Sequence, residues 1–277
     1  MSKKDKIKIV ILILLWAVAF YPLYPELVRE WLGNSDNSHA FIVPLVSMYF
    51  VWQRKNALQL TRAATSAWGG GLLALSLLAY IVSSAGGVAF PARVAMVTSL
   101  FGLVWFCLGK EFIQKLAFPI AFLFFMVPVP YSLISLVSMP LQLMATDVSA
   151  ALIGNCSIPV YREGNMLYFI QTQLEVAEAC SGIRSIMSLT MISLIFCFLS
   201  REGWWRRAVL VIAAIPIAIV ANIFRVTGTG VLAHFYGDRV AKGFLHEFSG
   251  IAIFVFGFAV LFFVFFFVNR KMTDDIQ

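Results

Sequence analysis

The sequence contains little charge. Asp, Glu, Lys and Arg make up 13% of its 277 residues, whereas 61% of the residues are hydrophobic and the mean hydropathy is +0.87. A soluble domain of this length needs far more polar surface, so the composition excludes a soluble enzyme and predicts a polytopic membrane protein. The apolar segments are separated by short polar joints only. We therefore expect residues 1–277 to form a single integral membrane domain with no separate soluble domain.

Cysteine and histidine are also scarce. The four cysteines show no spacing typical of a metal site, and no two of the three histidines stand at i, i+3 or i, i+4. A zinc site made by Cys180 and the three histidines is an alternative, but no carboxylate supports the pattern. We expect no metal and no cofactor. The net charge of +7 reports topology in a membrane protein, so we expect no nucleic-acid partner.

Long apolar runs dominate the rest of the chain. A spanning helix needs about 20 apolar residues, and about eight segments qualify: roughly 7–23, 39–53, 68–86, 92–109, 112–129, 181–199, 207–225 and 245–268. The first run follows the basic start "MSKKDKIK" without a small-residue cleavage site behind it, so we interpret it as a retained signal anchor. Residues 131–153 are amphipathic and low in charge, and they either lie flat in the interface, dip into the membrane or span it.

The basic residues predict the direction of the spans, because Lys and Arg collect on the cytoplasmic side. With the N-terminus inside and eight spans, the inner joints hold twice as many Lys and Arg as the outer joints. The C-terminus then also lies inside. This topology places residues 22–38, 155–180 and 226–244 outside.

One outer segment, residues 131–180, combines the amphipathic stretch with a break in the helical pattern at residues 159–177. There "EG" marks a turn, and "NMLYFI" and "QLEVA" are typical of short strands. The expected fold is therefore an all-α polytopic membrane protein. We expect about eight transmembrane helices, with an extra amphipathic helix and a small β-hairpin on the outer face that lead into Cys180.

The stretch "EVAEACSGIRS", residues 175–185, is polar in apolar surroundings. Its Cys180 falls at the outer end of the sixth span, where a helix N-terminus favours a thiolate. Arg184 lies on the same helix face at i+4 and adds to this effect. We include Glu178 and Ser181, which flank the cysteine, as supporting residues.

Two further helix ends are expected at the same depth. The seventh span runs outward and ends in "VANIFRVTGTG", which brings Arg225 to the outer boundary with Asn222 on the same face. The eighth begins at "GFLHEFSG", which places His246 there. A thiolate attacks a carbonyl carbon, a histidine moves the proton and a fixed cation stabilises the oxyanion. Together these three groups predict acyl transfer by a cysteine enzyme.

The other histidines and cysteines have competing interpretations. His39, in "SHAFIVP" at the outer start of the second span, is the rival of His246 as general acid and base. His234 lies in the loop-like stretch "LAHFYG" and is expected to be structural. Cys156 is outside, so a disulfide with Cys180 is an alternative. The remaining two cysteines, near inner helix ends, are expected to be apolar fillers: Cys107 and Cys197.

The motifs "EACSGIRS", "NIFRVTGTG" and "HEFSG", in this order and each at an expected outer helix end, resemble those of the exosortases. The likeness extends to "SHAFIVPLVSMYFVW" and "PVYREGN" and covers about residues 35–255. The resemblance implies a multi-pass bacterial membrane cysteine protease or transpeptidase, with Cys180 as nucleophile and Arg225 and His246 as its partners. Nothing in the sequence suggests the β-barrel of the sortases, so shared chemistry would be convergent.

The resemblance also implies the partners and the compartment. The substrates would be membrane-anchored exported proteins with a C-terminal Pro-Glu-Pro motif, a transmembrane helix and a basic tail. The enzyme would lie in the bacterial inner membrane with its active site facing the periplasm, linked to exopolysaccharide production, and a glycan or lipid is a candidate acceptor. A transporter or flippase-like component of polysaccharide export is the alternative, but the polar residues cluster at one face and no internal repeat is evident.

Overall fold

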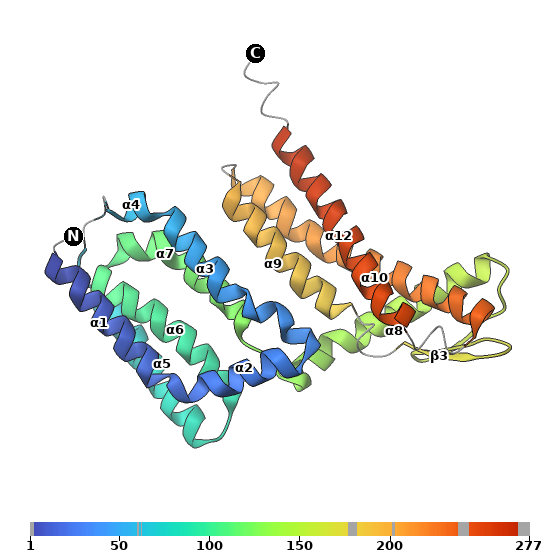
Figure 1. Cartoon of the computed structure of the whole chain (residues 1–277), viewed down its shortest axis with the longest axis horizontal. Helices are drawn as coiled ribbons and strands as arrows, with labels where there is room; N and C mark the ends of the chain where they lie inside the picture. The colour runs from blue at the N-terminus through green and yellow to red at the C-terminus, as the bar shows by residue number, and fades with distance from the viewer. Residues whose placement is uncertain are drawn as a thin grey trace, which may run out of the picture. The chain divides into compact units, whose positions relative to one another are not determined.

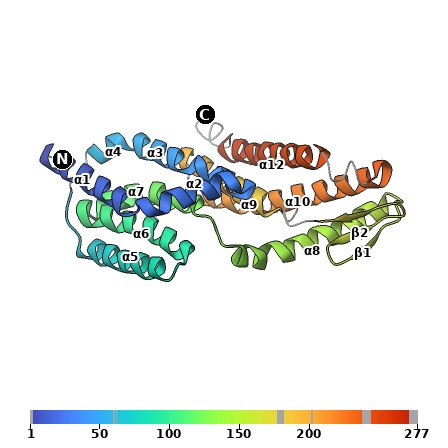
Figure 2. The same cartoon turned by 60° about the horizontal axis from the view of Figure 1, so that its bottom comes forward.

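The structure is a computed structural model that describes residues 3–59, 61, 63–176, 182–200, 203–237 and 244–270. These residues are mostly helical, and the chain divides into two compact units, Met1–Pro130 and Tyr131–Gln277 (Figures 1 and 2). The division follows the sequence "VPVP" at residues 127–130, where two prolines interrupt the helical hydrogen bonding.

The first unit consists of helices joined by short turns. Its elements are α1 (Lys3–Ala19), η1 (Tyr21–Leu23), α2 (Tyr24–Gly33), η2 (Ser35–Phe41), α3 (Val43–Gln53), α4 (Lys55–Gln59), α5 (Ala67–Ala85), α6 (Ala89–Leu108), α7 (Lys110–Phe122) and η3 (Leu123–Met126). Helices α5 and α6 approach closely at two glycines. A Cβ added at Gly69 would lie 2.3 Å from the backbone nitrogen of Phe106, and one added at Gly102 would lie 2.7 Å from that of Leu73. Small residues of this kind let membrane helices pack backbone to backbone.

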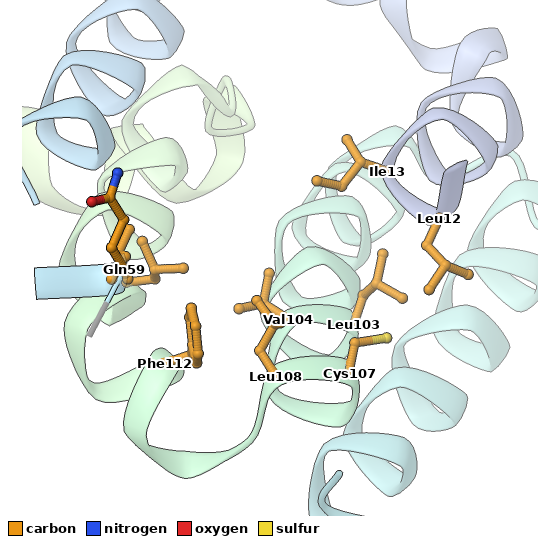
Figure 3. A pocket seen from close by; sticks show the side chains of 10 residues that line it. Leu12, Ile13, Gln59, Leu103, Val104, Cys107, Leu108 and Phe112 are labelled. Atoms are coloured by element: carbon orange, nitrogen blue, oxygen red, sulfur yellow. The ribbon is translucent and has the colours of Figure 1, made fainter. Parts of the chain in front are cut away.

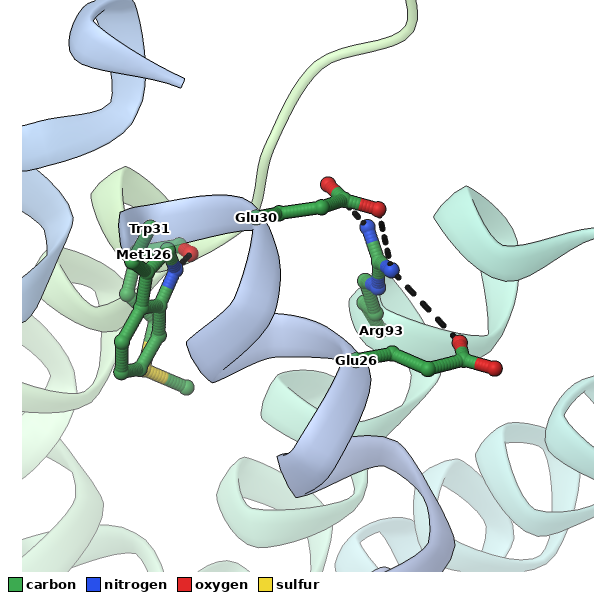
Figure 4. A network of polar contacts seen from close by, with 5 residues as sticks. All are labelled: Glu26, Glu30, Trp31, Arg93 and Met126. Atoms are coloured by element: carbon green, nitrogen blue, oxygen red, sulfur yellow. Dashed lines mark hydrogen bonds and ion pairs between the residues drawn. The ribbon is translucent and has the colours of Figure 1, made fainter. Parts of the chain in front are cut away.

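A buried arginine joins two segments of this unit. Arg93, near the start of α6, is only 3% exposed. It donates hydrogen bonds of 2.8 and 2.7 Å to the two carboxylate oxygens of Glu30 in α2, and its guanidinium lies 3.7 Å from the carboxylate of Glu26 (Figure 4). Beside it, Trp31 donates a 2.9 Å hydrogen bond to the carbonyl of Met126. Because a buried guanidinium needs such partners, this network fixes α2 against α6.

The count of eight spans is not confirmed. Among the described residues, five helices are long and apolar enough to cross a membrane, or up to six if the bent pair Val10–Ala19 and Tyr21–Gly33 forms one span. The predicted spans 39–53 and 112–129 each combine a short α-helix with a 3-10 turn, so α3 has 11 residues and α7 has 13. Hydropathy does not distinguish these two helix types, which explains the difference.

The second unit contains a bundle of three helices, α9 (Ile183–Leu199), α10 (Trp204–Tyr236) and α12 (Phe244–Arg270). Leu189, Ala214, Ala218 and Leu261 form the buried core of this bundle. A Cβ added at Gly257 of α12 would lie 3.0 Å from Leu189 Cδ1, so the absence of a side chain there lets α12 approach α9. The helices that carry the three motifs thus belong to one bundle. The prediction that Arg225 stands at a helix end is wrong, because α10 continues to Tyr236.

A small antiparallel sheet precedes this bundle in the chain. Its strands are β1 (Tyr161–Glu163), β2 (Met166–Tyr168) and β3 (Gln173–Glu175), in the order β1-β2-β3. Glu163 pairs with Met166 across a two-residue turn, in which Gly164 has a φ of +59° that favours glycine. The predicted hairpin is confirmed as β2 and β3. The sequence does not predict β1, because two of its three residues are charged and it lacks the apolar pattern of the other two strands.

The sheet packs on α8 (Tyr131–Asn155) and on the second half of α10 (Figures 1 and 2). The shared core consists of Ala145, Ile153, Ile158, Leu167, Phe169, Leu174, Val176, Val226 and Ala233. This packing explains why α10 runs to 33 residues, far beyond the predicted span 207–225. The loop-like setting predicted for His234 is therefore wrong, because residues 226–236 continue the helix. Tertiary contacts outweigh the low helix propensity of Gly228 and Gly230.

A candidate active site in the three-helix bundle

The chain that leads to Cys180 is anchored at Val176, which is buried. The carbonyl of Val176 accepts a hydrogen bond from the side-chain amide of Gln142 in α8 and another, of 3.3 Å, from that of Asn165. The N–H of Val176 in turn donates to the carbonyl of Asn165 at 2.9 Å. The strand end four residues before the cysteine therefore has a fixed position. Three predicted site residues lie outside the described residues: Glu178, Cys180 and Ser181.

The described chain resumes at Gly182, directly before α9. Gly182 is buried and has a φ of +82°, a left-handed conformation that glycine adopts without strain. A Cβ added there would lie 3.0 Å from both Cβ and Cγ of Asn222, whose own side chain is 3% exposed. Both the backbone angle and the close contact thus require glycine. The start of α9 lies directly against α10 at Asn222.

Arg225 lies one turn further along α10 on the same face as Asn222 and is partly buried. A Cβ added at Gly250 of α12 would lie 3.7 Å from Cζ and Nη2 of the Arg225 guanidinium. The backbone of His246 belongs to α12, although its side chain lies outside the described residues. His246 stands four residues before Gly250, on the same helix face and about 6 Å along the helix axis.

The structure therefore brings together the first turn of α9, the turn of α10 that holds Asn222 and Arg225, and the first turns of α12. A further hydrogen bond of 3.2 Å, from Ser149 Oγ of α8 to the carbonyl of Ile223, holds α8 to the same turn of α10. Gly182 lets α9 approach α10 closely, and Gly250 does the same for α12. The sequence analysis did not predict this role. The sequence offered one signal for this role: Gly182 follows Cys180 by two positions, and Gly250 follows His246 by four.

The remaining predicted site residues have different surroundings. Arg184, in the first turn of α9, is exposed. His39 belongs to η2 in the unit Met1–Pro130. The ring of His234 lies 6.1 Å from that of Phe169 and 5.1 Å from that of Phe235, in agreement with a structural role.

Two cysteines lie in apolar surroundings, as predicted for fillers. Cys107 lines a cavity of about 420 Å³ in the first unit, together with Leu103, Val104 and Phe112 (Figure 3). Cys197 is buried in α9, and its Sγ donates to the carbonyl of Arg207 at 3.3 Å. Within the described ranges, no group of three or more His, Cys, Asp or Glu side chains is arranged to hold a metal ion.

Comparison with known proteins identifies the family. A family model described as transmembrane exosortase matches residues 31–263, which is most of the chain. No curated protein and no solved structure matches. The chain therefore belongs to the transmembrane exosortase family, and its apolar helices are those of a multi-pass membrane protein.

Proposed function

We propose, from membership of the exosortase family, that this protein is a membrane cysteine protease or transpeptidase that cleaves C-terminal sorting signals of exported proteins. The observation that supports this proposal most is the meeting of the first turn of α9, one turn within α10 and the first turns of α12 at Gly182, Asn222, Arg225 and Gly250. Consecutive Cα atoms are 3.8 Å apart, so the Cα of Cys180 lies within about 7.6 Å of that of Gly182. Gly182, two residues after the proposed nucleophile, is the residue that contacts Asn222.

Each residue has a defined role in this mechanism. The thiolate of Cys180 attacks the carbonyl carbon of the scissile peptide bond, a thioester forms and the C-terminal part of the substrate leaves as an amine. His246 takes the thiol proton and delivers it to that amine. The guanidinium of Arg225 stabilises the oxyanion, and Asn222 positions the start of α9 beside it. The N-terminus of α9 and Arg184 favour the thiolate.

The substrate is a membrane-anchored protein whose own helix reaches the site by diffusion in the bilayer. Its Pro-Glu-Pro motif stands just above the outer surface, and its basic tail stays inside. Arg184 is exposed and Arg225 is partly buried, so we assign the pairing with the motif's glutamate to Arg184. Water, an amine, a glycan or a lipid then accepts the acyl group. The site faces the periplasm from the inner membrane, in a pathway of exopolysaccharide and surface-protein sorting.

Labelling from the outer side tests both topology and function. In a variant that lacks the three other cysteines, a membrane-impermeant maleimide should modify Cys180 and stop the processing of a co-reconstituted substrate. Two controls carry one engineered cysteine each and no other. A cysteine at Gln171, exposed in the loop between β2 and β3, should be labelled, and one at Trp204, exposed at the start of α10, should not. Labelling at Trp204 but not at Gln171 would indicate that the site faces the cytoplasm and would contradict the proposal.

The pH–rate profiles of variants at His246 and His39 should show which of the two is the general acid and base. His246→Ala should lower the rate of processing by about 10²–10⁴ and remove one limb of the pH–rate profile, as expected for the loss of a general acid and base. His39→Ala should have a milder effect and keep both limbs. The measurement is the rate with a reconstituted substrate at several pH values. If His39→Ala loses the limb and His246→Ala keeps it, the two residues exchange roles.

A further inference from the structure

The two faces of α8 have the reverse polarity of a helix in a soluble protein. Its exposed side carries large apolar residues, among them Leu136, which is 70% exposed, and Met139, which is 63% exposed. The residues of α8 that are almost fully buried are mostly small or hydroxyl residues: Ser138, Ala145, Thr146 and Ser149, together with Ile153. Apolar residues on the outside and hydroxyl groups on the inside are typical of a helix in contact with lipid.

The length and hydropathy of α8 would also allow it to span the membrane. It has 25 residues and a mean hydropathy of 1.5. It would then be about 37 Å long, enough to cross the hydrocarbon core. Its contacts decide against a span, because the sheet packs along its second half through Ala145 and Ile153.

The sheet cannot lie within the hydrocarbon core. Its edge strands β1 and β3 leave backbone N–H and C=O groups unpaired in a three-stranded open sheet, and open sheet edges do not occur in contact with lipid tails. Arg162 of β1 forms a 2.6 Å ion pair with Asp147 of α8, whose side chain is 66% exposed. Glu163 and Glu175 are exposed as well. These charges need water, so the second half of α8 lies at the membrane surface.

We infer that α8 is an interfacial helix whose binding partner is the outer surface of the lipid bilayer. Its Leu and Met side chains enter the boundary between headgroups and acyl chains, and the sheet stands above it in water. The same contact surface continues into the bundle, because α8 packs on α10, which is apolar enough to span. A lipid surface therefore covers the exposed apolar side chains in the first half of α8, whereas the exposed face of the second half, which carries Asp147, borders water.

This placement sets the height of the catalytic segment, a consequence that rests on the proposed function. Gln142 of α8 binds the carbonyl of Val176, four residues before Cys180, and Ser149 of α8 binds the carbonyl of Ile223 between Asn222 and Arg225. The depth of α8 in the lipid thus fixes the height of both the nucleophile and its cationic partner. The substrate's helix is embedded in the same bilayer, so the distance from membrane surface to scissile bond becomes a specificity determinant.

Depth measurements test the interfacial position without any need for activity. A spin label is attached to a single cysteine at Leu136, Met144 or Leu152 in the full chain, reconstituted in phosphatidylcholine vesicles. Collision with oxygen and with a water-soluble nickel chelate then reports depth. We expect shallow depth at all three positions. Each step of eight residues turns about 80° around the helix, so their depths should differ by no more than the helix diameter of about 10 Å and should show no maximum at position 144. In a spanning helix, positions 136 and 152 would lie about 24 Å apart along the membrane normal in opposite leaflets, and position 144 between them would be deepest in the bilayer.

Either of two results would overturn the lipid contact. One is a depth profile with its maximum at position 144, which indicates a span. The other is low collision with both reagents at all three positions, which indicates that protein, such as a second copy of the chain, covers the face.

The role in specificity is tested with a matched pair of variants. Leu136→Gln combined with Met139→Gln weakens the lipid contact, and Tyr161→Gln changes an equally exposed residue of the sheet. With the double variant, the mass spectrum of the product should show cleavage at several neighbouring peptide bonds. With Tyr161→Gln, it should show cleavage at a single peptide bond. One cleavage position in both variants would refute the role in specificity. A lack of processing by the unmodified chain would instead refute the proposed function and leave the depth result standing.

Discussion

Cys180→Ser abolishes processing of a reconstituted substrate while the protein stays folded in the membrane. This is the largest effect that we expect from a single substitution. A hydroxyl is much harder to deprotonate than a thiol near neutral pH, so serine offers almost no nucleophile at the start of α9. The measurement is the amount of cleaved substrate over time, with thermal unfolding in detergent as the check on folding. Near-normal turnover by Cys180→Ser would exclude covalent catalysis at this residue.

The other cysteines supply matched controls for that result. Cys107→Ala and Cys197→Ala remove thiols from apolar surroundings, and Cys156→Ser changes an exposed residue at the end of α8. All three variants should keep their activity. If Cys156→Ser were as damaging as Cys180→Ser, a disulfide between the two would replace catalysis as the explanation of both cysteines.

Arg225→Lys should lower the rate by about 10²–10³ although the positive charge is kept, which is the loss typical of removing one oxyanion donor. The guanidinium presents a planar fork of donors, and an ammonium group presents none with that geometry. The measurement is kcat with a saturating substrate. Arg184→Lys is the matched control, because Arg184 is exposed and acts through its charge, so a milder effect is expected. Full activity of Arg225→Lys would mean that Arg225 contributes only its positive charge and does not act as an oxyanion donor.

The sequence predicts that the three motifs share one membrane depth, because apolar runs and basic residues indicate where each span begins and ends. Apolar runs and the distribution of Lys and Arg place "EACSGIRS", "NIFRVTGTG" and "HEFSG" at one boundary, although they are far apart in sequence. The structure brings Gly182, Asn222, Arg225 and Gly250 together, and the placement of Cys180 and of the His246 side chain stays a prediction. The identity of the contacts could not be predicted, because it depends on the rotation of each helix about its axis.

The fold was less predictable where packing decides the structure. Hydropathy predicts a membrane span at residues 207–225. The helix α10 instead continues to Tyr236, because α8 and the sheet cover its second half. Gly230 illustrates the reason, since a Cβ added there would lie 2.7 Å from Ile153 Cδ1. A glycine that looks like a helix breaker in sequence is a packing contact in the structure. Similarly, only the charged sheet on α8 distinguishes an interfacial helix from a span.

The most direct test of the proposed mechanism is a search for the covalent intermediate. The enzyme is mixed with substrate, quenched in acid within the first turnovers and digested, and the peptide that contains Cys180 is examined by mass spectrometry. The mechanism predicts that this peptide carries the N-terminal part of the substrate, ending at the cleavage site, and that neutral hydroxylamine releases it as expected for a thioester. Cleaved product without any adduct on Cys180, formed equally well by enzyme whose Cys180 has been alkylated, would contradict the mechanism.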